Sequence, residues 1–403
     1  MMARRSRETS SCWVLVAGGF HADGGMDKLN AALARYLIDQ GHAVHLVAFR
    51  IDDSFLLRHA AGTYLVAKPA GSFFLGRTRL DRRGRRVAAA LKARGLRVRV
   101  VANGIGCTWP DINWVHFVNH AWPSRMMHGP RWLRLKSRIE ARHTLRLERH
   151  VLPRARLLIA NSRRTRADLL KYLQVPPDRI VTVYPGLESD WAPATAEERN
   201  RARSSLGISD PSPTILFVGA LGFDRRKGFD TLWEAWRRLA GREDWRATLL
   251  VAGDGRALPH WRRIVSASEY GKRVRFLGFA PIAEVLPAAD LLVSPTRYEP
   301  YGLNVHEAIC RGVPALVSAD AGVAERFPPS LRPCLLASPD DPDEIARRLV
   351  EWSGRGDDCR RLFAPLSRAL RDHTADAMAR QIVEAVTESS DGKWRELNDR
   401  RAV

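Results

Sequence analysis

Residues 291–314 read LLVSPTRYEPYGLNVHEAICRGVP, and this stretch decides how the second half of the chain folds. The run 291–294 is apolar up to its final serine, which predicts a strand buried on both faces. The chain then passes through a loop and opens a helix near Gly302. A helix N-terminus offers free backbone N–H groups and the positive end of a dipole, which together suit a diphosphate. The stretch therefore predicts an α/β domain with an anion site at this loop.

Two glutamates flank the predicted helix start. Glu299 precedes the helix, and Glu307 lies about one and a half turns inside it, at about 1.5 Å of rise per residue. Carboxylates on opposite sides of a phosphate site can accept hydrogen bonds from hexose hydroxyls and from ribose hydroxyls. A nucleotide sugar has that layout. The alternative is that an acid near a helix start only compensates the dipole, but the strand, the EPYGL sequence and the trailing RGVP together favour the functional interpretation.

The same alternation of short apolar runs and helical patterns extends over the whole chain. Apolar strands that alternate with helices predict parallel sheets covered on both faces, and the rhythm begins twice, at residues 13 and 214. The predicted strands are 13–17, 43–49, 157–160, 180–183, 214–219, 248–252, 274–277, 291–294 and 315–318, and the predicted helices include 26–40, 228–240 and 376–388.

A chain of 403 residues is long enough for two domains. We expect an N-terminal domain over 1–190, a linker over 191–213 that contains several prolines, and a C-terminal domain over 214–375. Two placements stay open for the last helix, at about 376–390: it can pack on either domain, which includes packing back on the first.

These motifs resemble glycosyltransferase family 4, whose signature is E-x7-E. The resemblance runs from about residue 14 to residue 390. It implies the GT-B fold, with two Rossmann-like doubly wound domains facing each other across a cleft. It also implies a retaining transferase with the nucleotide sugar on the C-terminal domain and the acceptor on the N-terminal one. The other landmarks are Gly24-Gly25, Ala160-Asn161-Ser162, Val183-Tyr184-Pro185-Gly186, Phe217-Val218-Gly219, Arg225-Arg226-Lys227-Gly228, Val251-Ala252-Gly253-Asp254-Gly255 and Val274-Arg275-Phe276-Leu277-Gly278.

Three cationic residues directly precede the predicted helix 228–240: Arg225, Arg226 and Lys227. They can neutralise donor phosphates and the charge that grows on a leaving diphosphate; the alternative is a solvated basic turn. Family members often carry arginine directly after the glycine of the preceding strand, where this chain has Ala220. The resemblance therefore favours Lys227 and leaves open whether Arg225 or Arg226 serves beside it.

Further donor contacts are expected from backbone at two helix starts. Gly302, Leu303 and Asn304 form the first turn after the Glu299 loop, where the resemblance implies diphosphate binding. Gly24 and Gly25 stand between a strand and a helix, where the lack of side chains lets amides approach a phosphate or an acceptor. An ordinary tight turn explains Gly24-Gly25 equally well.

The segment WVHFVNHAWP, residues 114–123, holds two histidines near a strand end. Isolated histidines usually serve packing or capping, but the resemblance favours His120, with His116 as the alternate, as a hydrogen-bonding partner of the transferred sugar. It also implies catalysis without a protein nucleophile, with the leaving phosphate taking the acceptor proton on the same face. No cofactor and no metal ion are expected, only the nucleotide-sugar donor.

The charge of the chain is uneven. Residues 1–190 carry 33 Lys and Arg against 14 Asp and Glu, which is +19 of the formal net charge of +21. The basic stretch 125–166 has Trp and Leu at near-helical spacing, a pattern typical of helices that lie on anionic membranes, although a solvated surface helix fits equally. We expect an acidic or lipid-linked acceptor, bound through loops such as 77–86 and 123–131. No nucleic-acid reader module is evident, so no nucleic acid is expected.

Five scattered cysteines without C-x-x-C spacing argue against a disulfide framework or a zinc site and suit a reducing compartment. The N-terminal run 12–17 follows three arginines but leads into Gly18-Gly19, so we interpret it as a basic tail and a first strand, not a signal peptide. A cytoplasmic location is expected, either free in the cytoplasm or at the inner face of the membrane. Two rival functions stay open: a nucleotide-sugar epimerase or hydrolase on the same fold, and a non-catalytic basic protein that binds anionic lipid or nucleic acid.

Overall fold

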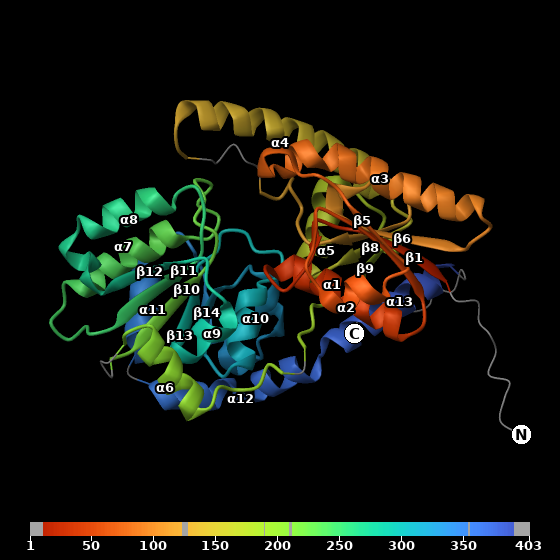
Figure 1. Ribbon diagram of the computed structural model, residues 1–403. Helices are drawn as coiled ribbons and strands as arrows, with labels where there is room; N and C mark the ends of the chain where they lie inside the picture. The colour runs from red at the N-terminus through yellow and green to blue at the C-terminus, as the bar shows by residue number, and fades with distance from the viewer. Residues whose placement is uncertain (1–10, 123–127, 189, 209–211, 354, 391–403) are drawn as a thin grey trace, which may run out of the picture. The chain divides into compact units, whose positions relative to one another are not determined.

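The computed structural model describes residues 11–122, 128–188, 190–208, 212–353 and 355–390. The chain divides into two units, each with its own parallel sheet (Figure 1). Within the described residues, unit 1 is drawn from the ranges 1–121, 139–186 and 375–403, and unit 2 from 122–138 and 187–374. The units are described separately below.

The sheet of unit 1 has seven parallel strands in the order β5-β3-β1-β6-β7-β8-β9. The third strand in this order, β1 (Cys12–Val16), is buried along its whole length because β3 and β6 flank it and helices cover both faces. The strands that follow β1 in the chain are first added on one side of it (β3, β5) and then on the other (β6 to β9). The topological switch point of the sheet therefore lies between β1 and β6. The strands are β1 (Cys12–Val16), β3 (Ala43–Ala48), β5 (Gly62–Leu65), β6 (Val98–Asn103), β7 (Ile112–Val115), β8 (Leu157–Ala160) and β9 (Ile180–Thr182), with a separate pair β2 (Gly19–Phe20) and β4 (Arg50–Ile51).

Helices from distant parts of the sequence cover the unit 1 sheet. The last helix, α13, packs against α1 and belongs to unit 1. Residues 77–86, expected as an acceptor-binding loop, lie inside helix α3; that expectation was wrong, because Leu80, Val87 and Leu91 recur at helical spacing and pack on the β1 face of the sheet. The helices are α1 (Gly25–Asp39), α2 (Ser54–His59), α3 (Phe73–Ala93), α4 (Arg131–Val151, which runs from unit 2 into unit 1), α5 (Arg163–Leu173) and α13 (Ala375–Ser390).

The sheet of unit 2 has six parallel strands in the order β12-β11-β10-β13-β14-β15. This order corresponds to 3-2-1-4-5-6, the arrangement of dinucleotide-binding domains, with the switch point between β10 and β13. The strands are β10 (Thr214–Val218), β11 (Thr248–Ala252), β12 (Val274–Gly278), β13 (Leu291–Ser294), β14 (Ala315–Ser318) and β15 (Leu335–Leu336).

One face of the unit 2 sheet carries a tryptophan-rich core. Trp233 and Trp236 of α7, Trp261 of α8 and Trp352 of α11 are buried against β10, β11 and β13. The helices of the unit are α6 (Ala196–Ser205), α7 (Phe229–Ala240), α8 (Leu258–Ser266), α9 (Ile282–Val285), α10 (Leu303–Cys310), α11 (Pro342–Ser353) and α12 (Gly356–Asp372). Helix α6 lies within the segment 191–213 and begins with a capping box in which Thr195 and Glu198 satisfy each other's backbone amides.

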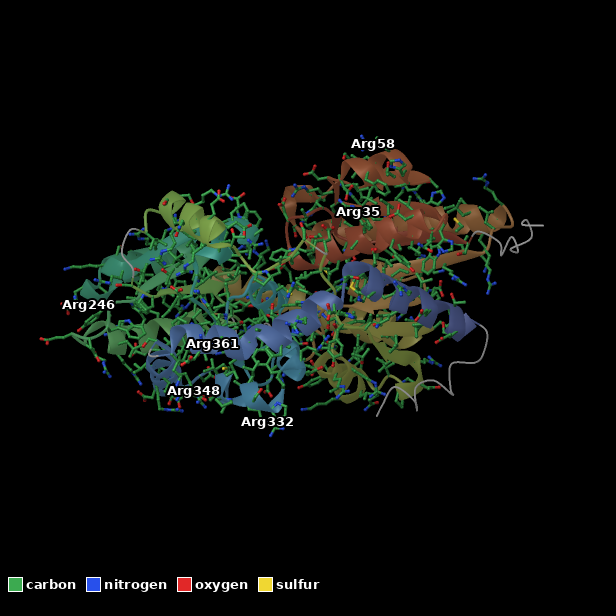
Figure 2. All side chains as sticks on the ribbon, turned by 90° about the horizontal axis from the view of Figure 1, so that it is seen from below. Arg35, Arg58, Arg246, Arg332, Arg348 and Arg361 are labelled. Atoms are coloured by element: carbon green, nitrogen blue, oxygen red, sulfur yellow. The ribbon has the colours of Figure 1, made fainter. Side chains whose placement is uncertain are left out.

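The surface of both units is rich in arginine. Figure 2 shows Arg35 and Arg58 on unit 1 and Arg246, Arg332, Arg348 and Arg361 on unit 2. Some of these side chains are paired, as Arg35 is with the buried Asp53 at 2.8 Å and Arg361 with the exposed Asp358. Exposed pairs such as Arg361–Asp358 contribute roughly 0–1 kcal/mol each, so the fold depends on the buried sheets and not on such surface charges.

Candidate donor-binding site

The candidate site of unit 2 lies at the switch point of its sheet. The loop 219–228 follows β10, and the loop 295–302 follows β13, the neighbouring strand. Because both strands are parallel, their carboxyl ends meet at the same edge of the sheet, where ligands of open α/β sheets bind. The two motifs that the sequence singled out, 225–228 and 299–307, are therefore brought together.

Close backbone contact holds the two loops against each other. Gly228 has φ +71°, and a side chain there would place its Cβ 1.8 Å from the carbonyl oxygen of Pro295. The amide of Arg297 donates to the carbonyl of Arg226 at 2.9 Å. Only glycine at 228 allows this approach, so the basic loop and the Glu299 loop form one rigid surface.

The central contact of the site joins Lys227 to Glu299. The Lys227 Nζ donates to Glu299 Oε2, and Arg226 Nη1 lies 4.0 Å from the same oxygen. Arg226 also donates to the carbonyl of Tyr298 at 3.1 Å. The Lys227 and Glu299 side chains are only 15% and 11% exposed. Two cations thus converge on one carboxylate at the edge of the sheet.

Burial and charge oppose each other in this pair. Burial alone would raise the pKa of Glu299, but the neighbouring Lys227 and Arg226 outweigh it and hold that pKa below its ordinary value. Burial lowers the pKa of Lys227, and the Glu299 charge offsets this only in part. Since an ammonium group has three donors, Lys227 can bind a second anion while it keeps Glu299.

Arg225 points away from this contact. It has φ +54°, a left-handed conformation, and its exposed side chain lies 3.7 Å from Asp230. Of the two arginines that the sequence left open, the structure brings Arg226 to Lys227 and Glu299 and turns Arg225 toward α7.

One residue of the loop was missed by sequence reasoning. Arg297 binds Asp230 through two bonds of 2.8 and 3.0 Å and contacts Thr231 and Asp340 as well. It therefore anchors the Glu299 loop to the start of α7. In the sequence Arg297 stands out only by its place between the strand and Glu299. Nothing in that local pattern indicates its partner, Asp230, which is 67 residues away.

The N-terminus of α10 completes the site. Gly302 is the N-cap residue, with φ +108°, and Leu303 is the first helical residue. The side-chain Nδ2 of Asn304 donates to the carbonyl of Val218 at 3.1 Å, which ties the first turn to the end of β10. Glu307 is 4% exposed and lies one turn after Leu303 and Asn304, on the same helix face. Among the backbone amides of the first turn, that of Val305 donates to the Gly302 carbonyl at 3.1 Å. Those of Leu303 and Asn304 have no partner within the helix and lie beside the cationic loop.

In unit 1, a buried glutamate positions His120. Glu148 is 1% exposed, and its two oxygens accept bonds from the backbone amides of Asn119 and His120 and from the Asn119 side chain, at 2.7–3.0 Å. The His120 Nδ1 contacts Glu148 Oε2 at 2.6 Å. Such a bond fixes the orientation of the ring and leaves Nε2 as the ring nitrogen that can bond a ligand. Glu148 was also missed, since it lies 28 residues from His120 in a helix that shows only a basic pattern.

The alternate histidine, His116, is half-buried beside Trp114. The two rings are tilted with their centroids 4.5 Å apart, and burial lowers the pKa of His116 to about 3. Gly24 is the exposed N-cap residue of α1, with φ +88°, and Gly25 opens that helix at the switch point of unit 1. Both glycines and His120 belong to unit 1, whereas Lys227, Arg226, Arg225, Glu299, Gly302, Leu303, Asn304 and Glu307 belong to unit 2.

Other expectations concern what the described residues contain. Residues 123–127 of the expected loop 123–131 lie outside the description, and Arg131 already starts α4. The five cysteines are all free thiols, and no group of three metal-ligating side chains was found among the described residues. None of the helices in the described ranges is long and apolar enough to span a bilayer.

Comparison with known proteins agrees with this architecture. The solved structure of WaaG, a glycosyltransferase involved in lipopolysaccharide biosynthesis, superposes with a TM-score of 0.73 at 22% identity, over 93% of this chain and 99% of that one. Anabaena HepE, solved in complex with UDP and glucose, gives 0.70 at 16% identity, over 94% and 100%. Two Rossmann-like parallel-sheet domains in this arrangement of elements define the GT-B fold, as predicted.

Sequence comparison then gives the family. The family model described as Glycosyltransferase Family 4 matches residues 23–191, and the one described as Glycosyl transferases group 1 matches residues 212–353. An uncharacterised glycosyltransferase of Methanocaldococcus jannaschii is 28% identical over 208 residues, which is 49% of this chain and 52% of that protein. The chain belongs to glycosyltransferase family 4. It spans about half the length of the curated relatives it matches.

Proposed function

We propose that this chain is a retaining glycosyltransferase, which moves a hexose from a nucleoside diphosphate sugar to an acceptor hydroxyl without a metal ion. The observation that carries the proposal is the convergence of Lys227, Arg226 and Glu299 with the N-terminus of α10 at the switch point of unit 2. The family membership and the UDP and glucose bound by HepE support it.

The donor would lie across this edge of the sheet. Lys227 and Arg226 would bind the diphosphate together with the backbone amides of Gly302, Leu303 and Asn304, so that side-chain cations supply the charge that a divalent ion supplies elsewhere. Glu299 would accept hydrogen bonds from the hexose, and Glu307 from the ribose. Lys227 would bridge Glu299 and the phosphate, because its ammonium group has three donors.

The reaction would proceed on one face of the sugar. The bond between the anomeric carbon and the diphosphate oxygen breaks, and the acceptor oxygen bonds to the same carbon from the same side. The leaving diphosphate takes the proton of the acceptor hydroxyl. The protein contributes position and charge stabilisation and no covalent intermediate. His120, held by Glu148, would donate a hydrogen bond to the transferred hexose, and the exposed Gly24-Gly25 backbone would contact the donor or the acceptor.

The first test identifies the donor. A thermal-shift screen of UDP, GDP, ADP and their sugars on the full chain should raise the melting temperature with one base, since a ligand at 100 times its Kd stabilises by about 2.7 kcal/mol. Transfer with that donor should be lost in Glu299→Ala and in Glu307→Ala, and kept in Glu284→Ala, an exposed glutamate of α9.

Product analysis separates the rival reactions. A glycoside of an added acceptor that keeps the anomeric configuration of the donor supports the proposal. An epimerised nucleotide sugar, or free sugar formed without acceptor, points to an epimerase or hydrolase. Wild-type transfer rates in both glutamate variants would overturn the site. Chelation with EDTA should leave the rate unchanged.

We also propose that unit 1 and α4 bring the enzyme to an anionic membrane surface at the cytoplasmic face, with a lipid-linked, glycan or small-molecule acceptor. Trp132, Leu135 and Ile139 of α4 are 67%, 61% and 61% exposed, at the i, i+3 and i+7 positions of one helix face. Exposed arginines, among them Arg131, Arg134 and Arg138, flank this stripe. An apolar stripe bordered by cations suits an anionic bilayer.

Co-sedimentation tests the membrane proposal. Wild-type chain should pellet with vesicles that contain phosphatidylglycerol and not with phosphatidylcholine alone. Trp132→Ser with Leu135→Ser should abolish pelleting, whereas Phe279→Ser, at a residue that is 69% exposed in unit 2, should not. Equal pelleting of all three would show that the stripe has no role.

A further inference from the structure

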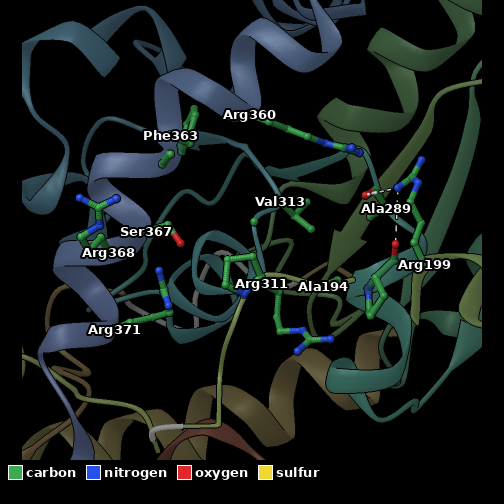
Figure 3. A pocket seen from close by; sticks show the side chains of 14 residues that line it. Ala194, Arg199, Ala289, Arg311, Val313, Arg360, Phe363, Ser367, Arg368 and Arg371 are labelled. Carbon is green, nitrogen blue, oxygen red and sulfur yellow. Dashed lines mark hydrogen bonds between the residues drawn. The ribbon is translucent and has the colours of Figure 1, made fainter. Parts of the chain in front are cut away.

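Unit 2 contains a second cationic cavity, at the opposite end of its sheet from the candidate donor site. The cavity has a volume of about 300 Å³ and is lined by the turn after α10, by α12, by the 193–194 segment and by the residues that precede β13 (Figure 3). Ala289 and Val313 lie just before strands β13 and β14, whereas Glu299 and Lys227 follow the strands β13 and β10. The four residues of β13 separate the two ends by roughly 10 Å or more, so the cavity is not part of the donor site.

Five arginines and no carboxylate line this cavity. Arg360, Arg368 and Arg371 come from α12 with Phe363 and Ser367, at spacings of three, four and seven residues that bring them to one helix face. Arg311 at the end of α10 lies across from Arg368 and Arg371, whereas Arg199 of α6 lies beside the guanidinium of Arg360. Proline, valine and phenylalanine side chains form the rest of the wall.

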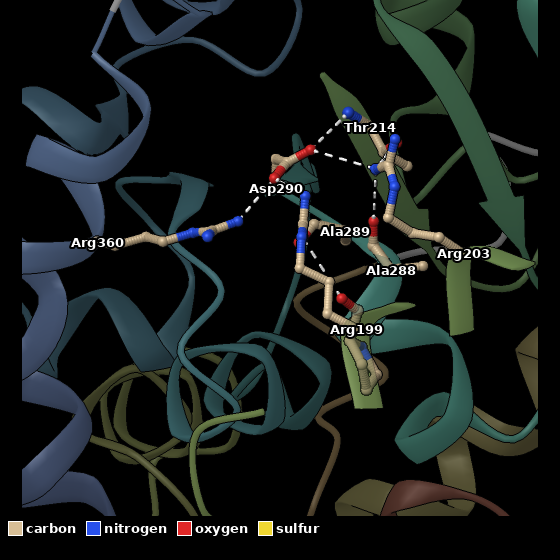
Figure 4. A network of polar contacts seen from close by, with 8 residues as sticks. Arg199, Arg203, Thr214, Ala288, Ala289, Asp290 and Arg360 are labelled. Carbon is tan, nitrogen blue, oxygen red and sulfur yellow. Dashed lines mark hydrogen bonds and ion pairs between the residues drawn. The ribbon is translucent and has the colours of Figure 1, made fainter. Parts of the chain in front are cut away.

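The five arginines differ in how far they are neutralised. Arg199 and Arg360 each donate to Asp290 at 2.6 Å (Figure 4). Arg203, which does not line the cavity, forms an ion pair with the same carboxylate at 3.8 Å. Arg311 pairs with Glu198 at 3.0 Å. No carboxylate of the described residues forms an ion pair with Arg368 or Arg371. The cavity therefore has a surplus of positive charge on the α12 side.

Unpartnered polar atoms mark the same side. Ser367 is 3% exposed, and its Oγ has no hydrogen-bond partner among the described residues; the same holds for the buried Nε atoms of Arg371 and Arg311. Buried hydroxyl and guanidinium groups are nearly always bonded in folded proteins. Figure 3 shows Ser367, Arg368 and Arg371 on neighbouring turns of α12, with Arg311 opposite them. A tetrahedral dianion offers the acceptors that this set of donors lacks.

We propose that this cavity binds the phosphate group of a small phosphomonoester, with its organic part against Phe363 and Val313. Arg368 and Arg371 supply positive charge that no carboxylate of the described residues neutralises. Ser367 supplies a hydroxyl donor, and Arg311 supplies a further guanidinium group. The carboxyl end of α10 also faces the cavity and disfavours an anion. Charge-assisted bonds from several guanidinium groups are the stronger effect. The site is independent of the proposed transfer reaction.

Calorimetric titration of the full chain with glucose 6-phosphate tests this site. Titrations with glucose, and with sodium chloride at matched ionic strength, show whether the phosphate is needed. We expect saturable binding of glucose 6-phosphate only, weakened at least about tenfold by Arg368→Gln with Arg371→Gln, which removes the two unpaired cations. The double variant Arg332→Gln with Arg361→Gln changes the same net charge at exposed residues outside the cavity and should bind as wild type.

Two further measurements separate this site from the donor site. Lys227→Met should keep glucose 6-phosphate binding, and the Arg368/Arg371 variant should keep nucleotide binding and its melting temperature without ligand. Loss of binding in Lys227→Met would place the sugar phosphate at the donor site and overturn the proposal. Absence of binding by the wild type at millimolar glucose 6-phosphate, or equal binding by the Arg368/Arg371 variant, would overturn it as well.

Discussion

Two clusters of unit 2 gather cations around one carboxylate, at opposite ends of strand β13. Asp290 directly precedes the strand and binds Arg199, Arg203 and Arg360, while Glu299 follows the strand and binds Lys227 and Arg226. The Asp290 cluster is tied to backbone on all sides: its carboxylate accepts from the Thr214 amide at 2.9 Å, and Arg199 donates to the carbonyl of Ala289. The Glu299 cluster instead faces a helix N-terminus and glycine-lined backbone.

The two clusters differ in whether their donors are already satisfied within the protein. At Asp290 the carboxylate and its arginines satisfy one another and the ends of β10 and β13, so the cluster fastens α6 and α12 to the sheet. At Glu299 the ammonium group of Lys227 has donors available for a second anion, beside the Leu303 and Asn304 amides, which have no partner within α10. On the function proposed here, similar residue types support the fold at the amino end of the strand and bind the donor at its carboxyl end.

The largest effect is expected from Lys227→Met. Methionine keeps the length of the side chain and removes the charge that would stabilise the leaving diphosphate, so kcat should fall by about 10²–10³-fold, the typical cost of losing one preorganised stabilising group. Steady-state transfer kinetics measure it. Lys272→Met, the same substitution at an exposed lysine of unit 2, is the control. A loss of less than threefold in Lys227→Met would mean that the Glu299 cluster is structural, like that of Asp290.

Asp290→Asn should have the opposite signature. Arg199, Arg203 and Arg360 would lose their common carboxylate in a cluster whose aspartate side chain is only 15% exposed. We expect the free energy of unfolding to fall by about 2–4 kcal/mol, somewhat below the cost of breaking a fully buried ion pair. The rate per folded molecule should stay within about twofold. Urea unfolding followed by tryptophan fluorescence measures the loss, and Asp358→Asn, at an exposed pair on α12, should change it by less than about 1 kcal/mol.

The sequence predicted the strands and the loops that carry these two clusters, but not the contacts within the clusters. The strands 157–160, 248–252, 291–294 and 315–318 were predicted at the residues where they occur, because each is a short apolar run buried on both faces. The anion loop and the helix start near Gly302 follow from local pattern in the same way. Residues 77–86 were misjudged because six arginines among them obscured a helix whose buried face is carried by Leu80, Gly84 and Val87.

Contacts between distant residues were beyond the reach of a local pattern. Asp290 meets Arg199 and Arg360 across 91 and 70 residues, and His120 meets Glu148 across 28. The choice between Arg225 and Arg226 depends on a left-handed backbone at Arg225 that no composition announces. Long-range pairing and single dihedral angles, not propensity, separate these residues.

The smallest expected effect concerns pH and distinguishes Glu299 by its ionisation. Its pKa is held below the ordinary value of about 4.3, so the folded state binds fewer protons than the unfolded one in the acid range. The stability that Glu299 contributes is then fully present above about pH 5 and is lost as the pH falls through its folded pKa. Glu299→Gln removes the titrating group, and the difference in unfolding free energy between wild type and variant should shrink between about pH 5 and pH 3. Urea titrations at several pH values measure it, with Glu243→Gln, at an exposed glutamate, as the baseline. A difference that stays constant down to pH 3 would mean that the Lys227 and Arg226 charges do not stabilise the Glu299 carboxylate, and the carboxyl end of β13 would then lack the charge pairing on which the comparison with Asp290 depends.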